Sequence, residues 1–157
     1  MSKPLMDRIA WIVALALSGV AAGMFLMDVF AYYPLLRRLS EQDAIRLHHA
    51  SVGLRRAIFR SIVRSSGIAC IVLIVFFSNG AARSLLIGSL ACLILLVIYT
   101  NVALIPLNRE IAGWKPTAPP GDWRMRFSEM IARERFRGLL PAVAFVMELV
   151  ASRRFGP

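Results

Sequence analysis

Side chains that could move protons or hold an anion gather in two parts of the chain, residues 28–56 and residues 99–137. The first part contains an aspartate near two tyrosines and a pair of adjacent histidines, and the second contains two asparagines and a run rich in arginine. Imidazole, carboxylate and guanidinium groups supply most acid–base and anion-binding chemistry in proteins. The candidates are Asp28, Tyr32, His48, His49, Asn101, Asn108, Arg133 and Arg137.

Helical spacing limits what these residues can do together. Asn101 and Asn108 are seven residues apart and therefore lie on one helix face, whereas the adjacent His48 and His49 point to different faces. At most one histidine can face a given site. Asn101 lies in an apolar run, where a primary amide needs a hydrogen-bond partner. Asp28 lies at the end of another, where an acid pairs with a cation or changes its protonation state.

Each candidate also has a plain structural interpretation. Tyr32 fits an aromatic anchor at a membrane interface. The arginines, which include Arg133 and Arg137 at i, i+4 spacing, fit residues that fix topology or contact anionic lipid heads. A chemical role for any of them therefore depends on what surrounds it.

The elements that carry these residues are membrane helices. Of 157 residues 58% are hydrophobic, and they are gathered in blocks. A bilayer core of about 30 Å needs roughly 20 apolar residues in a helix, and a lipid-exposed backbone must be helical. We therefore expect an all-α fold, an antiparallel bundle of four transmembrane helices forming a single membrane domain over 1–157. The spans are expected at about 9–30, 57–78, 83–106 and 136–151.

The fourth span has the weakest pattern, because it contains Glu148 and has Pro141 in its second turn. A three-span protein is the alternative.

Helical patterns also extend beyond the apolar blocks, on the N-terminal side of the second span and of the fourth span. Ser40 is a good N-cap for a helix over 41–64, and 122–137 reads as a helix entering the fourth span. Helices 2, 3 and 4 are therefore expected to extend on one side into a small polar head.

Charge predicts the orientation. The chain has 19 Lys and Arg against 9 Asp and Glu. With four spans, five of the cations lie beside the termini and the short turn near Gly80, and the other fourteen lie in and around the two longer loops. The positive-inside rule then places loops 31–56 and 107–135 in the cytoplasm and both termini on the opposite side of an inner or plasma membrane. Because hydropathy accounts for the basic charge, we expect a lipid bilayer and no nucleic acid as the partner.

The apolar start of the chain could also be a signal peptide, but its length favours an uncleaved helix. Small residues supply the expected packing surfaces. Gly19 and Gly23 form a GxxxG pattern, and Gly88 lies between Ser84 and Cys92 at four-residue spacing. These faces are expected to contact each other, a second copy of the chain, or a partner membrane subunit. We interpret Cys70 and Cys92 as packing residues that could face one another, with no metal ligand set around them.

Several short motifs together resemble a known family. They are a Thr-Asn-Val-Ala-Leu-Ile-Pro-Leu-Asn segment, a tryptophan, a proline-rich loop, a second tryptophan, and an arginine-rich helix ending in Arg-Gly-Leu-Leu. In this chain they stand at 100–108, Trp114, 115–121, Trp123 and 137–140, after a glycine-rich first span and Pro34. This arrangement is similar to the anthrone-oxygenase-like family of small four-helix membrane proteins.

The resemblance implies an oxidase or oxygenase that acts on a flat apolar aromatic substrate at the cytoplasmic helix ends. Anthrone oxidation begins with loss of a C–H proton, which leaves a phenolate-like anion that reacts with dioxygen. On this hypothesis His48 or His49 is the base, and Arg133 and Arg137 stabilise the anion. The other expected substrate contacts are Asp28, Tyr32, Asn101, Asn108 and Trp123.

Two questions stay open from the sequence. Dioxygen could react without a cofactor, or a haem or metal could be bound with His48 or His49 as a ligand. The chain could instead be a non-enzymatic membrane accessory or scaffold subunit that packs through its small-residue helix faces. A cavity in the polar head that reaches Asn101 would favour the enzyme, and a head filled by side chains would favour the subunit.

Overall fold

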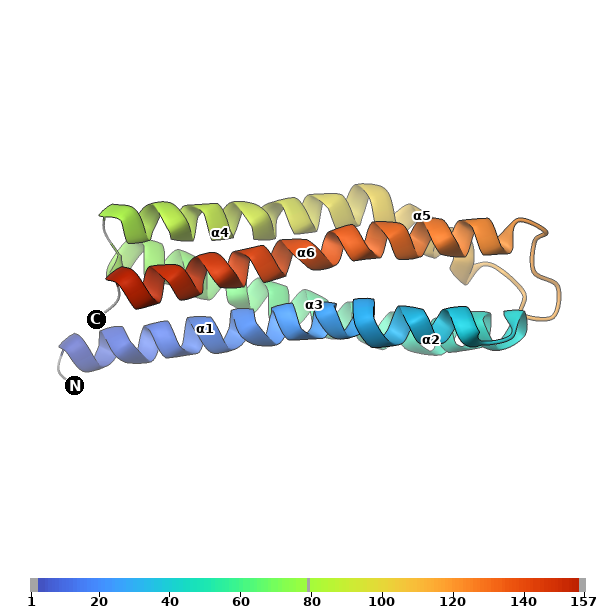
Figure 1. Cartoon of the computed structure of the whole chain (residues 1–157), viewed down its shortest axis with the longest axis horizontal. Coiled ribbons are helices and arrows are strands. Elements are labelled where there is room, and N and C mark those ends of the chain that lie inside the picture. Colours follow the sequence, from blue (N-terminus) through green and yellow to red (C-terminus); the bar gives the residue numbers. More distant parts are fainter. Residues whose placement is uncertain (1–2, 79, 156–157) are drawn as a thin grey trace.

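The computed structural model describes residues 3–78 and 80–155, and the fold of this part of the chain is all-α, with a loop at 113–122. Four helical rods run lengthwise beside one another (Figure 1). The first comprises α1 (Lys3–Met27), η1 (Asp28–Tyr32) and α2 (Tyr33–Arg38), and the second α3 (Glu41–Val72) and η2 (Leu73–Phe77). The third comprises α4 (Gly80–Tyr99), η3 (Thr100–Leu104) and α5 (Ile105–Ala112), and α6 (Trp123–Phe155) forms the fourth.

Three of these rods are long and apolar enough to cross a membrane, namely Leu5–Arg38, Glu41–Phe77 and Gly80–Ala112. These rods contain three of the four predicted spans and are consistent with a membrane protein. The fourth rod, α6, has the length but not the apolar composition, because Arg137 and Glu148 interrupt its apolar part. Whether α6 crosses the bilayer therefore stays a prediction.

Close contacts at glycines bring α6 against its neighbours. A Cβ added to Gly138 would lie 3.0 Å from Val29 Cγ2, and one added to Gly88 would lie 3.1 Å from Met147 Sδ. A Cβ on Gly19 would lie 3.2 Å from Phe145 Cε2, whereas one on Gly23 would meet nothing within 4 Å. The first half of the GxxxG pattern and Gly88 are therefore used inside the chain, where small residues let helices approach.

The first rod is longer than the sequence indicated. The predicted apolar span ends near residue 30, and the helical rod continues beyond it through η1 and α2 to Arg38. The physical reason is a wide turn before a proline. Pro34 has no N–H and would break an ordinary helix, but the N–H of Tyr33 donates to the Asp28 carbonyl, five residues back. The same device precedes Pro106, where the N–H of Ile105 donates to the Thr100 carbonyl.

The rod ends opposite the α3–α4 turn have a hydrophobic core of their own. It is built from all four rods and includes Tyr33, Ile45, Ile111 and Phe127, with Trp114 and Trp123 packed against it. Ser40 caps α3 as predicted, because its Oγ accepts a hydrogen bond from the Asp43 N–H at 3.3 Å. The start of α1, the end of α6 and the start of α4 all lie at the other end of the molecule (Figure 1).

Candidate functional site

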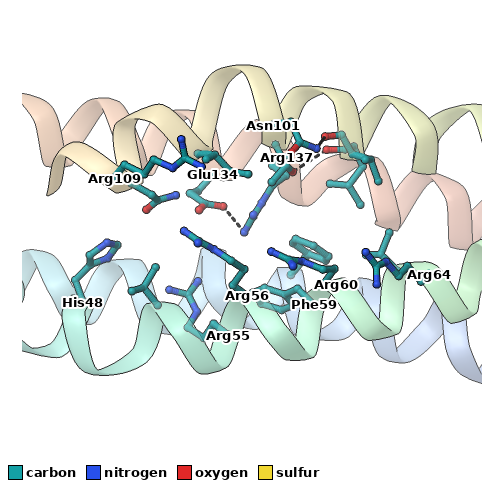
Figure 2. A pocket seen from close by; sticks show the side chains of 18 residues that line it. His48, Arg55, Arg56, Phe59, Arg60, Arg64, Asn101, Arg109, Glu134 and Arg137 are labelled. Carbon is teal, nitrogen blue, oxygen red and sulfur yellow. Dashed lines mark hydrogen bonds and ion pairs between the residues drawn. The ribbon is translucent and has the colours of Figure 1, made fainter. Parts of the chain in front are cut away.

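A cavity of about 510 Å³ lies between α3 and the third rod, next to the core at the polar end. This volume falls in the range of about 300–1,000 Å³ that is usual for small-molecule sites. Its polar lining consists of His48, Arg55, Arg56, Arg60, Arg64, Thr100, Asn101, Asn108, Arg109, Glu134 and Arg137 (Figure 2). Phe25, Phe59, Leu96, Val97 and Ile105 are among its apolar residues.

The two cysteines lie in different packing clusters. Cys70 is buried near the α3–α4 turn and donates through Sγ to the Leu86 carbonyl at 3.3 Å. Cys92 belongs to another hydrophobic cluster, and both cysteines are free. The two thiols are therefore separate packing residues.

The walls of the cavity lie mainly on α3 and on α4, η3 and α5. Phe25 of α1 and Glu134 and Arg137 of α6 complete the lining.

Asp28 and Arg55 form a buried ion pair beside the cavity. The guanidinium of Arg55 contacts the Asp28 carboxylate directly and donates to the Tyr33 hydroxyl at 3.1 Å. It also lies 4.0 Å from the centre of the Tyr32 ring, within cation–π range. Asp28 has thus found a cation, as an acid at the end of an apolar run requires, and Tyr32 holds that cation from the other side.

Glu134 and Arg137 form a second buried pair, on α6. Arg137 Nη2 lies 2.5 Å from Glu134 Oε2, and its guanidinium lies 4.9 Å from the Phe25 ring centre. Burial raises the pKa of the Glu134 carboxyl, and the cationic Arg137 and Arg55 oppose that rise. The Arg137 Nε is buried with no hydrogen-bond partner in the described structure. This arginine therefore has a donor to spare at the cavity wall.

His48 is the histidine that reaches the cavity. Its side chain is 2% exposed, and neither ring nitrogen has a hydrogen-bond partner among the described residues. Phe127 lies edge-on to it at 5.9 Å between ring centres. His49 points elsewhere, and its Nε2 lies 3.1 Å from the Ile111 carbonyl oxygen. Because buried polar groups are nearly always hydrogen-bonded, an unpartnered His48 at a cavity wall is the unusual feature of this site.

Asn101 lines the cavity at the widened turn η3. Its Nδ2 donates to the Val97 carbonyl at 2.7 Å, and the neighbouring Thr100 hydroxyl donates to the Leu96 carbonyl at 2.7 Å. Both side chains bond to carbonyls four residues back in the same rod, which gives an amide inside an apolar run its hydrogen-bond partner. Asn108 lines the same cavity from α5. The structure thus brings both asparagines, His48 and Arg137 together.

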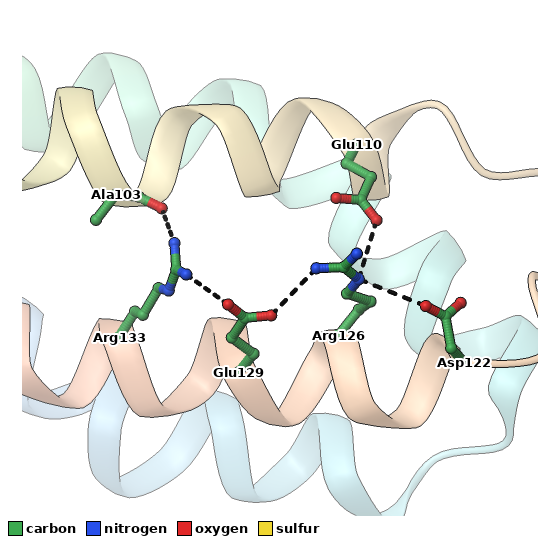
Figure 3. Close-up of polar contacts among 6 residues, drawn as sticks. All are labelled: Ala103, Glu110, Asp122, Arg126, Glu129 and Arg133. Atoms are coloured by element: carbon green, nitrogen blue, oxygen red, sulfur yellow. Dashed lines mark hydrogen bonds and ion pairs between the residues drawn. The ribbon is translucent and has the colours of Figure 1, made fainter.

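Arg133 lies outside the cavity. It donates to the Ala103 carbonyl at 2.7 Å and pairs with Glu129, which also contacts Arg126 at 3.4 Å (Figure 3). Glu110 and then Glu129 and Asp122 raise the pKa of Arg126 by their negative charges. This network joins α6 to the third rod. Arg133 is therefore placed as a structural link.

Trp123 is also remote from the cavity. It packs against Phe127, with ring centres 5.9 Å apart, and lines a separate shallow groove with Leu36 and Arg37. The residues that sequence reasoning did not assign to the site are Arg56, Arg60, Arg64 and Arg109. The four-residue spacing of the first three, which places them on one face of α3, was the signal that could have found them.

The lining offers little to a metal ion. Among the described residues, no group of three or more His, Cys, Asp and Glu side chains could hold one. His48 is the single imidazole at the cavity wall, and the Glu134 carboxylate there is paired with Arg137. The lining therefore supplies one imidazole that can act as a base, His48, and several guanidinium cations.

A family model described as anthrone oxygenase matches residues 49–147. The chain belongs to the anthrone oxygenase family. The matched segment contains every cavity-lining residue on the third rod and α6, and the arginines on α3. His48 lies one residue before it, and Asp28 lies outside it on the first rod. No curated protein and no solved structure matches the chain.

Proposed function

We propose that this membrane protein oxidises a flat apolar aromatic substrate with dioxygen in the cavity between α3 and the third rod. The observation that carries the proposal is a buried, unpartnered imidazole, His48, in the wall of a cavity rich in arginine. A base and fixed cations are what removal of a C–H proton to give a phenolate-like anion requires. Membership of the anthrone oxygenase family supports the same reaction class.

In this mechanism His48 takes the proton from an activated C–H of the substrate. Burial and the nearby cation Arg55 both favour the uncharged imidazole, which is the form that accepts a proton. The electron pair left on carbon delocalises onto the substrate oxygen. There Arg137, with its unused Nε donor, stabilises the negative charge.

The oxidation balances with dioxygen alone. The carbanion transfers electrons to dioxygen and forms a C–O bond, and the proton on His48 returns to give a hydroperoxide. Loss of the second C–H proton then forms the C=O bond as the O–O bond breaks, and hydroxide leaves and becomes water. One CH₂ group and one O₂ thus yield one C=O group and one H₂O, without a resident cofactor.

The alternative is a non-enzymatic accessory subunit. The packing surfaces favour the enzyme, because Gly19 and Gly88 are used within the chain. A cavity that reaches Asn101 also favours it, because a pure packing module would fill this space with side chains. Gly23 is still free to contact another chain.

The test is turnover by the purified full chain in lipid nanodiscs. Anthrone is added, and anthraquinone formation and oxygen uptake are followed together. We expect both in equal amounts, above the rate with empty nanodiscs and unchanged after treatment with a chelator. A chelator-sensitive rate, or a visible absorbance band from the purified protein, would replace the cofactor-free mechanism by a haem or metal one.

We further propose that α6 crosses the membrane as a fourth span and that the arginine-rich ends form a cytoplasmic head. α6 runs along the whole length of the other rods, and Glu148 is buried, with Ser89 Oγ donating to it at 2.7 Å (Figure 1). Burial against other helices is how membrane proteins accommodate an acid.

Cysteine labelling in intact cells tests this orientation. In a background with both native cysteines replaced, Thr117→Cys in the loop before α6 should react with an impermeant maleimide only after the membrane is opened. Ala81→Cys, at the start of α4, should react in intact cells. Arg154→Cys, near the end of α6, should also react in intact cells. Protection of this position until the membrane is opened would contradict the four-span topology.

A further inference from the structure

We propose that the row Arg56, Arg60 and Arg64 on α3, together with Arg109 on α5, binds a carboxylate or phosphate group carried by the apolar molecule in the cavity. The inference rests on the proposed function, which supplies the aromatic part of that molecule. It adds the class of substrate, an aromatic acid or another anionic amphiphile.

The three α3 arginines form a continuous edge of the cavity. Their four-residue spacing places them on one helix face, and all three line the cavity (Figure 2). Arg109 lines it from α5. Four guanidinium groups along one cavity can hold an anion by paired, charge-assisted hydrogen bonds.

These four cations are not neutralised by the protein. Among the ion pairs of residues 3–78 and 80–155, none includes Arg56, Arg60, Arg64 or Arg109. The other two arginines of the cavity do have carboxylate partners, Arg55 with Asp28 and Arg137 with Glu134. Within the cavity lining, the unpaired positive charge therefore belongs to Arg56, Arg60, Arg64 and Arg109. A bound anion would offset this charge.

The cavity also has apolar side chains. Leu96, Val97 and Ile105 line it from the third rod, beside the polar Thr100, Asn101 and Asn108, and the Phe25 and Phe59 rings stack with their centres 4.6 Å apart. A molecule that fills the cavity would therefore meet aliphatic and aromatic side chains as well as guanidinium groups. An apolar body with one anionic group matches this mixed lining.

Two sources could supply the anionic group, the aromatic ligand itself or the head of an anionic phospholipid. Arg60 and Arg64 lie at the start of the second apolar span, where a lipid head can reach them. Both sources require the same arginines, and the experiment separates them by varying the ligand and the lipid independently.

The experiment measures binding of two matched probes to the full chain in nanodiscs of neutral lipid, by isothermal titration against empty nanodiscs. The probes are anthraquinone-2-carboxylate and its neutral carboxamide. We expect the carboxylate to bind at least tenfold more tightly. Replacing the row in the variant R56Q/R60Q/R64Q should abolish that preference and leave the affinity for the carboxamide nearly unchanged.

The matched control removes the same charge from elsewhere. R38Q/R46Q/R135Q replaces three exposed arginines that do not line the cavity, so the preference for the carboxylate should remain. The second arm repeats the titration in nanodiscs that contain an anionic phospholipid. Carboxylate affinity that is unchanged by this lipid assigns the anionic group to the ligand. If the anionic lipid instead weakens binding of the carboxylate, and does so in the native protein but not in R56Q/R60Q/R64Q, the anionic group belongs to the lipid.

The inference would be overturned if the carboxylate and the carboxamide bind equally well and the effect of anionic lipid is the same in the native protein and in R56Q/R60Q/R64Q. A preference for the carboxylate that survives in R56Q/R60Q/R64Q would overturn it as well. Failure of the proposed oxidation gives a different result, because the probes are already oxidised and need only bind. An acid preference without anthrone turnover leaves this inference standing, and turnover without the preference leaves only the proposed function.

Discussion

Replacing His48 by phenylalanine is expected to lower turnover by about 10²–10⁴-fold, the usual contribution of a general base, while the protein stays folded. Neither ring nitrogen of His48 has a hydrogen-bond partner in the described part of the chain, so the imidazole makes no polar contact there that phenylalanine would remove. A partnered histidine would behave differently, since its loss would strand a buried donor or acceptor at a cost of about 1–3 kcal/mol. The measurements are the rate of anthraquinone formation and the melting temperature in detergent.

The matched control is the adjacent histidine. His49→Gln keeps a side chain that can reach the Ile111 carbonyl, and it lies outside the cavity, so turnover should remain near native. Native turnover in His48→Phe would show that His48 is not the base. Loss of folding in His48→Phe, with normal activity in His48→Gln, would make His48 a packing residue.

The Asp28–Arg55 pair gives the largest expected effect on stability. Asp28→Ala should reduce the free energy of unfolding by about 3–5 kcal/mol, because it leaves the buried Arg55 without its carboxylate. The double variant D28L/R55L should recover much of this loss, since it removes both charges and leaves apolar side chains between η1 and α3. Denaturant unfolding in detergent, monitored by circular dichroism, measures both.

An exposed pair on the same helix provides the control for this cycle. Asp43 and Arg46 lie 3.7 Å apart with more than half of each side chain exposed, so Asp43→Ala should cost less than about 1 kcal/mol. A loss of similar size in Asp28→Ala and Asp43→Ala would show that the buried pair does not hold η1 to α3. No recovery in D28L/R55L would show that Asp28 acts through other contacts.

The helices could be predicted from the sequence because hydropathy and length decide them locally. The three apolar blocks are confirmed, and Ser40 marked the start of α3 correctly. The continuation of the first rod to Arg38 was not predicted, because a proline normally stops a helix. The wide turn before Pro34 depends on a hydrogen bond from the Tyr33 N–H to the Asp28 carbonyl, five residues back. No local sequence pattern predicts this bond.

The candidate site was harder to predict, because it depends on which helix faces meet. The sequence indicated that only one histidine could face a site, and the fold selects His48. Arg133 and Arg137 look equivalent by spacing, yet Arg133 binds the Ala103 carbonyl whereas Arg137 lines the cavity. The four-residue spacing of Arg56, Arg60 and Arg64 places them on one helix face, but that this face lines a cavity is a tertiary feature.

The central claim is that the cavity converts an aromatic CH₂ group and dioxygen into a ketone and water, with His48 as the base. Simultaneous measurement of oxygen uptake and anthraquinone formation tests it most directly, with native protein and His48→Phe in neutral-lipid nanodiscs. We expect one O₂ consumed for each anthraquinone formed by the native protein, and a rate for His48→Phe close to that of empty nanodiscs. Equal rates for native protein, His48→Phe and empty nanodiscs would contradict the claim.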